Sequence, residues 1–522
     1  MPPDTDAARW KRILREQADA AELELRVAAL ERARAEAVLV LEQARSAVDD
    51  FDGELHGMRQ RQQQAADHVA QMRMNYRREL LRRMPAELLS YIFEEVTALP
   101  ADFRETTKAV DCYNEALTMA PFCLAAVCSK WRNVALQQST LWTYISAPSD
   151  MEDDETGKQH HNRVKLLLAR SHSSALDVLI SWAGVDDWVG CVAEVWILQA
   201  VAVHAGRWRT FELWLPDNST DGYELQILRM PLPRVERLCI VVDIARPVHR
   251  DADDGYLPFA PTLRELTIWG PNVISMPARV SFPALTSLRL WHHPQFDLVW
   301  RLLSTVAPTL ESLLLSFDSD EKGPDIPKSV IALPNLRSAS LLISSRTIWR
   351  RMHRLHVPNL RHLTMETQDA IADVVQPFLD MVADTVVSLT LSGDVSLSEL
   401  VLFKTLLNVE SLQFDVFGYE CDEQYEVFSD FFAAEAVWVQ QKVWPKLSSV
   451  ILSTNGSVLD EEYERLMPFV RWRTVDVDRW EGDDTAPRRL ETLALNGQNA
   501  PLWVISQAQV LISSRYELAT GQ

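Results

Sequence analysis

The chain has 522 residues, of which 47% are apolar and 24% charged, a composition typical of a protein with material for a large core. The length allows about three domains, or fewer if one of them is an extended repeat array. Only 16 residues are glycine, and neither G-x-x-x-x-G-K-[ST] nor G-x-G-x-x-G occurs, which argues against a nucleotide-binding fold.

The charge is unevenly distributed along the chain. Residues 1–83 hold 15 of the 52 basic and 15 of the 73 acidic residues, so the net charge of −21 lies entirely in residues 84–522. Because an acidic body is repelled by polyphosphate and by anionic membrane surfaces, we expect neither nucleic acid nor a membrane as a partner. Apolar runs are too short for a membrane span and no signal-peptide pattern occurs, so we expect a soluble protein of the cytoplasm or nucleus.

Catalytic and metal-binding motifs are missing from the sequence. The six cysteines form no C-x-x-C pair, and neither G-x-S-x-G nor H-E-x-x-H occurs. His353, His356 and His362 form the one histidine cluster worth testing, and without a nearby cysteine they fit a solvated repeat boundary better than a metal site. We therefore expect no enzyme, no cofactor and no metal.

Residues 1–80 form a first segment, which lacks proline from residue 10 onwards and is rich in good helix formers. Two series of positions, each repeating every seven residues, begin at Leu23 and Val27, and fourteen of their sixteen residues are apolar or aromatic. This seam predicts a coiled-coil arm. Gly53 and Gly57 each cost about 1 kcal/mol within a helix, so a kink or a hairpin is the alternative to a dimer.

Residues 81–147 form a second segment of short, very apolar helices. Pro85 opens the first helix, and a second is predicted over residues 122–135. The apolar faces consist of Leu88, Leu89, Ile92 and Phe93 in the first and of Leu124, Val127, Cys128, Trp131 and Val134 in the second. Roughly 65 residues cannot bury all of this surface alone, so a partner is implied.

This second segment resembles an F-box. The first half of that motif, Leu-Pro-x-Glu-(Leu/Ile)-Leu-x-x-Ile-Phe, matches Met84 to Phe93 with Met in place of the first Leu. The second half, Val-Cys-(Arg/Lys)-x-Trp-Arg-x-(Ile/Val)-Ala and then Leu-Trp, matches Val127 to Ala135 and then Leu141 and Trp142. An insertion near residues 102–117 departs from the pattern. F-box proteins of mushroom-forming fungi are similar, since they often carry such insertions and a coiled coil directly upstream.

The resemblance implies that this segment binds a Skp-family adaptor and, through it, a cullin. The residues implied to bind the adaptor are Met84, Pro85, Leu88, Leu89, Ile92, Phe93, Val127, Cys128, Trp131, Leu141 and Trp142. The alternative is that these residues form only a helical core.

The rest of the chain is repetitive. Residues 148–162 are predicted to be an acidic, solvated linker, and residues 163–522 a repeat array. The unit Pro-x-Leu-x-x-Leu-x-Leu recurs, and the prolines between Pro233 and Pro358 step by 28, 22, 25, 26 and 24 residues, which is the leucine-rich repeat period. We expect a short strand in each unit, beginning with 176–180, and outer-layer helices at 296–306 and 371–382. The asparagine or cysteine ladder typical of such repeats is missing from its usual place.

The predicted fold is therefore mixed α and α/β: a coiled-coil helix, a three-helix F-box and an irregular leucine-rich repeat solenoid. The implied function is substrate recognition in a Skp–cullin–F-box ubiquitin ligase, and a non-catalytic scaffold is the alternative. The residue after the last core leucine of each strand points to the open side of the sheet, and in three units it is a tryptophan. Trp214, Trp269 and Trp291 are thus the candidate anchors for a protein substrate.

Overall fold

The computed structural model describes fifteen stretches of the chain: 6–98, 114–147, 154–181, 192–215, 224–242, 257–270, 282–291, 296–317, 329–366, 372–392, 402–416, 443–454, 460–475, 487–496 and 502–519. The chain divides into two compact units, Met1–Leu89 and Ser90–Gln522. The predicted domain boundaries at residues 80, 147 and 162 do not appear in this division.

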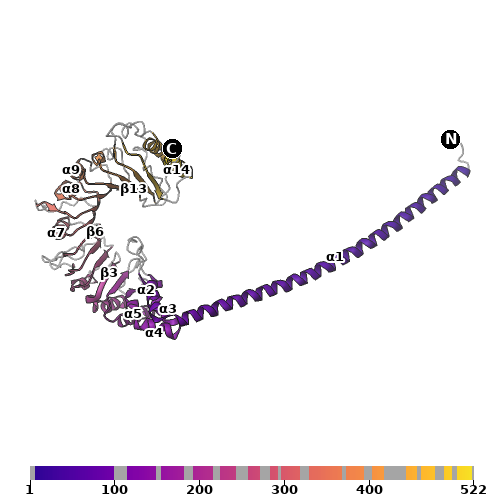
Figure 1. Ribbon diagram of the computed structural model, residues 1–522, viewed down its shortest axis with the longest axis horizontal. Helices are drawn as coiled ribbons and strands as arrows, with labels where there is room; N and C mark the ends of the chain where they lie inside the picture. The colour runs from indigo at the N-terminus through magenta and orange to yellow at the C-terminus, as the bar shows by residue number, and fades with distance from the viewer. Residues whose placement is uncertain are drawn as a thin grey trace. The chain divides into compact units, whose positions relative to one another are not determined.

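The first unit is dominated by one helix. α1 runs from Asp6 to Arg83, 78 residues without a break, and is drawn as one continuous ribbon in Figure 1. The helix passes straight through Gly53 and Gly57, so it does not fold back into the hairpin that the glycines allowed. The prediction of a long N-terminal helix is confirmed.

Short helices follow α1. They are α2 (Ala86–Thr97), α3 (Glu115–Val127), α4 (Ser129–Gln137) and the 3-10 helix η2 (Ser139–Trp142). The single helix predicted over residues 122–135 is wrong, because Cys128 adopts an extended conformation, with φ −162°, and separates α3 from α4. The Cys128 thiol sulfur caps α4 by accepting a hydrogen bond from the Trp131 backbone N–H at 3.4 Å. The predicted insertion at 102–117 lies largely outside the described residues.

Among the described residues of the second unit, thirteen strands form one parallel sheet, and they follow one another in chain order. They are β1 (Tyr144–Ala147), β2 (Leu176–Ser181), β3 (Trp208–Leu215), β4 (Arg237–Val242), β5 (Glu265–Trp269), β6 (Ser287–Trp291), β7 (Ser312–Phe317), β9 (Ser338–Ile343), β11 (His362–Glu366), β12 (Ser388–Ser392), β13 (Ser411–Val416), β14 (Ser449–Thr454) and β15 (Thr492–Asn496). A separate two-stranded sheet pairs β8 (Ile331–Ala332) with β10 (Leu355–His356).

Helices connect many of these strands. They are α5 (Asp154–Arg170), α6 (Val192–Ala202), η3 (Ala205–Arg207), η4 (Glu224–Arg229), α7 (Phe296–Val306), α8 (Arg346–Met352), α9 (Ala372–Val382), η6 (Phe403–Thr405) and α13 (Asp460–Thr474). A further helix, α14 (Leu502–Ala519), follows β15. The strands follow a curve, and α7, α8 and α9 lie along its outer side (Figure 1). The described chain is thus a mixed α/β protein, and the helices predicted at 296–306 and 371–382 are present as α7 and α9.

Two predictions at the start of the sheet are wrong. The first strand is β1, which pairs with β2 and places Tyr144 beside Asp177, so residues 144–147 belong to the sheet rather than to the preceding helices. Residues 154–162, predicted to be part of a solvated linker, form the first half of α5. The acidic residues at its start favour a helix N-terminus, because the helix dipole attracts negative charge there.

The repeated leucines build the core between the sheet and its outer helices. In β5, Leu266 and Ile268 are fully buried, whereas the alternate residues Glu265, Thr267 and Trp269 lie on the opposite face. We call this opposite face of the sheet the inner face. β6, β9 and β11 repeat this alternation, whereas every residue of β1 and β2 is buried. In the alternating strands the period of two therefore fixes which residues are core.

Side chains also join neighbouring repeats at the turn that precedes each strand. The side-chain amide of Asn335 donates to the carbonyl oxygen of Pro308 at 2.7 Å, and that of Asn359 donates to Pro334 at 2.7 Å. Asn408, two units beyond Asn359, makes the same kind of contact with the carbonyl of Asp384 at 2.8 Å. These asparagine side chains satisfy carbonyl oxygens in the turns, which the pairing of parallel strands leaves without a hydrogen bond. They lie at a different position in the repeat from the one where the sequence pattern of leucine-rich repeats places the usual asparagine ladder.

Candidate functional site

The helix α2 carries apolar side chains on the side that its neighbours leave open. Leu88 is 54% exposed, Tyr91 62% and Ile92 39%. Their spacing of i, i+3 and i+4 places them on one stripe of the helix. Leu89 and Phe93, one position further round, are fully buried. The helix α2 is therefore apolar on two sides, and only the side of Leu89 and Phe93 is buried within the structure.

A second exposed apolar position lies at the junction of α3 and α4. Val127 is 57% exposed, and Cys128 is an exposed free thiol. Trp131, one turn into α4, is half-buried, with its ring centroid 4.9 Å from that of Phe93. Trp131 thus connects α4 to the buried side of α2 and still presents part of its ring to solvent.

Several of the residues implied to bind an adaptor are internal. Leu141 and Trp142 are at most 2% exposed, and the Trp142 indole N–H donates to the carbonyl oxygen of Ala135 at 2.8 Å. The ring of Phe122 meets Trp142 edge-on at 5.2 Å, and the Arg170 guanidinium lies 4.3 Å from its centroid. Leu141 and Trp142, like Leu89 and Phe93, are therefore buried rather than exposed.

The remaining residues of that set are accessible. Pro85 is exposed and Met84 half-buried at the start of α2. The Leu89 N–H donates to the Pro85 carbonyl oxygen at 3.2 Å, so Pro85 lies directly before the first turn of α2 rather than within it. The accessible members of the predicted site are Met84, Pro85, Leu88, Ile92, Val127, Cys128 and Trp131, and Tyr91 joins them although no motif named it.

The tryptophan column of the inner face is in the predicted register. Trp214 lies beside Val241, Val241 beside Trp269, and Trp269 beside Trp291. Trp214 is only 8% exposed, because it packs in a small cluster with Cys239 and Val241, so its predicted role as an exposed anchor is wrong. Trp269 and Trp291 are half-buried and accessible from the inner face.

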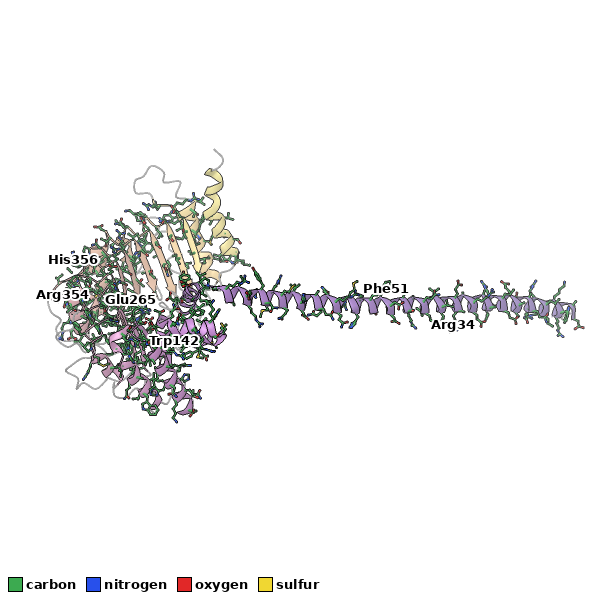
Figure 2. All side chains as sticks on the ribbon, turned by 60° about the horizontal axis from the view of Figure 1, so that its bottom comes forward. Arg34, Phe51, Trp142, Glu265, Arg354 and His356 are labelled. Carbon is green, nitrogen blue, oxygen red and sulfur yellow. The ribbon has the colours of Figure 1, made fainter. Side chains whose placement is uncertain are left out.

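At the other end of the same strands, charged side chains line a cavity of about 610 Å³. It lies between the sheet residues of β1 to β5 and the end of α2, and Glu265, one of its lining residues, is labelled in Figure 2. The Arg209 guanidinium donates to both carboxylate oxygens of Asp177, with Nε 3.0 Å from Oδ1. The Thr210 hydroxyl donates to the same Oδ1 at 3.1 Å.

A second ion-pair group in this cavity centres on Arg237. Its Nη2 lies 3.4 Å from Glu212 Oε1 and its Nε 3.7 Å from Glu265 Oε2. Burial raises the pKa of the Glu212 carboxyl, because the charged form loses hydration. The positive charge of Arg237 lowers this pKa but does not fully offset the effect of burial, and the negative charges of Asp177 and Glu265 raise it further. The cavity is thus lined by an ordered charge network that holds two largely buried carboxylates, Asp177 and Glu212.

Sequence reasoning missed this cavity. Its lining comes from residues at the starts of different strands, such as Asp177, Arg237 and Glu265, which are separated by long intervals in the chain. One feature of the sequence could have indicated the cavity. Charged residues occupy strand positions that alternate with the core leucines, and these positions lie on the same face of the sheet as the tryptophans.

Other classes of site find no support in the described stretches. No group of three His, Cys, Asp or Glu within them is arranged to hold a metal ion. His353, His356 and His362 are exposed, and Figure 2 labels His356 on the sheet-containing unit. None of the described helices combines the length and the apolar character that a bilayer span needs. No protein-family model matches the sequence, and no curated protein is similar to it.

Proposed function

We propose that this chain is the substrate-recognition subunit of a Skp–cullin–F-box ubiquitin ligase. In this proposal, α2 to α4 form the F-box that binds the Skp adaptor, and the repeats bind the target protein as a leucine-rich repeat solenoid. The ordered resemblance of residues 84–93, 127–135 and 141–142 to the F-box supports the assignment. Such a complex works in the cytoplasm or nucleus.

One observation carries the proposal: α2 is apolar on two sides, and the outer stripe is uncovered among the described residues. Leu88, Tyr91 and Ile92 expose large side chains next to the fully buried Leu89 and Phe93. A core-only explanation accounts for the buried pair and leaves the outer stripe unexplained. If an adaptor covers the outer stripe, the motif is apolar on one side for internal packing and on the other for binding the adaptor.

The repeats support the second half of the proposal. A long parallel sheet presents a continuous inner face, and repeat proteins use such faces to bind other proteins. This chain supplies position rather than chemistry in the proposal, since it raises the effective concentration of a substrate beside the ubiquitin-charged enzyme. Trp269 and Trp291 are the proposed anchors.

The test is adaptor capture by the full chain carrying both Leu88→Asp and Ile92→Asp. Placing carboxylates in an apolar interface costs several kcal/mol, so we expect loss of the adaptor and of the cullin with an unchanged melting temperature. The matched control is Leu407→Asp, because Leu407 is 55% exposed and Leu88 54%, and it lies outside the proposed F-box.

Two outcomes contradict the proposal. Undiminished adaptor capture by the double variant would place the adaptor elsewhere on the chain. A wild-type chain that binds no adaptor and no cullin would favour the alternative, a scaffold that uses its repeats without joining a ligase.

A further inference from the structure

The α1 helix leaves a long apolar seam uncovered. The seam consists of Leu23, Val27, Leu30, Arg34, Ala37, Leu41, Ala44, Val48, Phe51, Leu55, Met58, Gln62, Ala65, Val69, Met72 and Tyr76, at alternating spacings of four and three residues. Its large apolar side chains are 42 to 69% exposed, and no described side chain of α1 is buried. Figure 2 labels Phe51 of the seam and Arg34, its one charged member.

We propose that this seam binds the α1 helix of a second copy of the chain, and that the two helices run antiparallel. This inference does not depend on the proposed ligase function. A seven-residue repeat drifts around a straight α-helix, so it stays buried only if a second helix supercoils with the first. The occupant is a second copy because the seam complements itself when it is reversed.

The complementarity is clearest in the register that overlaps the whole seam. Its layers pair Leu23 with Tyr76, Val27 with Met72, Leu30 with Val69, Arg34 with Ala65, Ala37 with Gln62, Leu41 with Met58, Ala44 with Leu55, and Val48 with Phe51. Both polar members of the seam, Arg34 and Gln62, then face an alanine. A small residue opposite leaves room for the apolar stem of Arg34 to cover the seam while its guanidinium reaches water.

The charges that flank the seam also match in this direction. Glu24 lies next to the partner's Arg73, and Arg45 next to the partner's Asp52, within two residues of the same level. By the symmetry of the dimer each pair occurs twice. No like-charged pair occurs among the flanking residues over residues 23–76 in this arrangement.

A parallel dimer is less favourable on both counts. In register it places Arg34 against the partner's Arg34 inside the seam, where two like charges share a poorly hydrated layer. It also sets Asp19 beside the partner's Glu24, although it gains contacts of Arg26 with Glu31 and of Glu54 with Arg59. The antiparallel direction keeps all the apolar layers and avoids both repulsions.

The direction decides where the two chains leave the dimer. In the antiparallel register the ends of the two helices, at Arg83, are about 100 Å apart at 1.5 Å rise per residue. A parallel dimer would bring them together. The proposed assembly therefore presents two copies of the second unit from opposite ends of a rod.

Cysteine cross-linking of the full chain tests the direction, because α1 has no cysteine of its own. A disulfide forms only if the two Cα atoms lie within about 7 Å of each other. We expect Leu30→Cys mixed and co-folded with Val69→Cys to give a disulfide between positions 30 and 69, identified by peptide mapping. Neither variant alone should cross-link at its new cysteine. Cross-linking by Leu30→Cys alone, or a wild-type monomer at micromolar concentration in light scattering, would overturn the proposal.

Reversal of one charge gives an independent test, because it should change the dimer dissociation constant in opposite directions for antiparallel and parallel helices. Glu24→Arg faces the partner's Arg73 in the antiparallel dimer and should raise the dimer dissociation constant roughly tenfold. The same change relieves the repulsion with Asp19 in a parallel dimer and should lower that constant. Adding Arg73→Glu to the same chain should restore wild-type dimerisation. A tighter dimer with Glu24→Arg, or no rescue by the double variant, would contradict the antiparallel pairing.

Discussion

Trp269 and Trp291 stack on each other across the two adjacent strands β5 and β6. Their ring centroids are 5.0 Å apart with an angle of 19° between the ring planes, and the two residues are direct partners in the strand register. Trp269 also packs against the buried cluster of Trp214, Cys239 and Val241. One end of the aromatic column is therefore core and the other end is surface.

This gradient predicts different costs of truncation along the column. Trp214→Ala should lower the free energy of unfolding by about 3–5 kcal/mol, because it empties a buried site, and Trp291→Ala by about 1–2 kcal/mol. Chemical denaturation measures both values, and Trp10→Ala is the control because Trp10 is 61% exposed on α1. Equal losses at Trp214 and Trp291 would mean that both are core, and unchanged substrate capture by Trp291→Ala would remove its proposed anchoring role.

Gly270, directly after this column, occupies a backbone conformation that other residues avoid. Its φ is +122°, and a Cβ built there would lie 2.0 Å from the carbonyl oxygen of Val242 on the neighbouring strand. Its N–H donates to the Trp291 carbonyl oxygen at 3.1 Å. We expect Gly270→Ala to cost about 3 kcal/mol, from strain and from separation of β4 and β5. Gly53→Ala, on the open surface of α1, should instead leave stability unchanged or raise it.

The ion pair of Asp177 and Arg209 should respond unequally to removal of its two members. The Asp177 side chain is 6% exposed and that of Arg209 49%. Arg209→Met leaves a buried carboxylate without its guanidinium and should cost about 3 kcal/mol of unfolding free energy. Asp177→Asn frees an arginine that water can hydrate, so its cost should be about 1 kcal/mol. A larger loss with Asp177→Asn in urea denaturation would contradict this assignment.

Glu212 should make stability fall as pH rises. Burial raises the pKa of its carboxyl above the ordinary value, so between the two pKa values the folded state binds more protons than the unfolded state. The stabilisation from Glu212 is complete below the unfolded pKa and is lost as pH rises through the folded pKa. Glu212→Gln should therefore gain stability relative to wild type as pH rises above the ordinary pKa of the carboxyl. A difference that stays constant over unfolding curves across this rise in pH would contradict the raised pKa.

Local periodicity was enough to predict many of the elements. The seven-residue seam indicated α1, and the leucine spacing identified core residues such as Leu266 and Ile268 and the register of Trp269 beside Trp291. These features depend on residues within one turn or one strand, so a short window of sequence contains the information. The break at Cys128 was missed, because apolar spacing continues through it and only the cap reveals the interruption.

The candidate site was predicted less well. The F-box-like motif predicted both Leu88 and Leu89 as binding residues, yet Leu88 is exposed and Leu89 is buried. Neighbouring residues on a helix lie about 100° apart, so the rotation of α2 against its neighbours decides which of them a partner can reach. Rotation depends on packing with segments distant in the chain, and no local pattern specifies it.

Hydrophobic periodicity was sufficient to predict the long helix, its seven-residue seam, the repeat period and the alternation that divides core from inner face. Three further features depend on how the chain packs: β1 joins the sheet, Trp214 is covered, and Asp177, Arg237 and Glu265 meet around one cavity. The physical reason is that parallel pairing places side by side strands separated by whole repeats, and burial and charge are properties of that assembled surface.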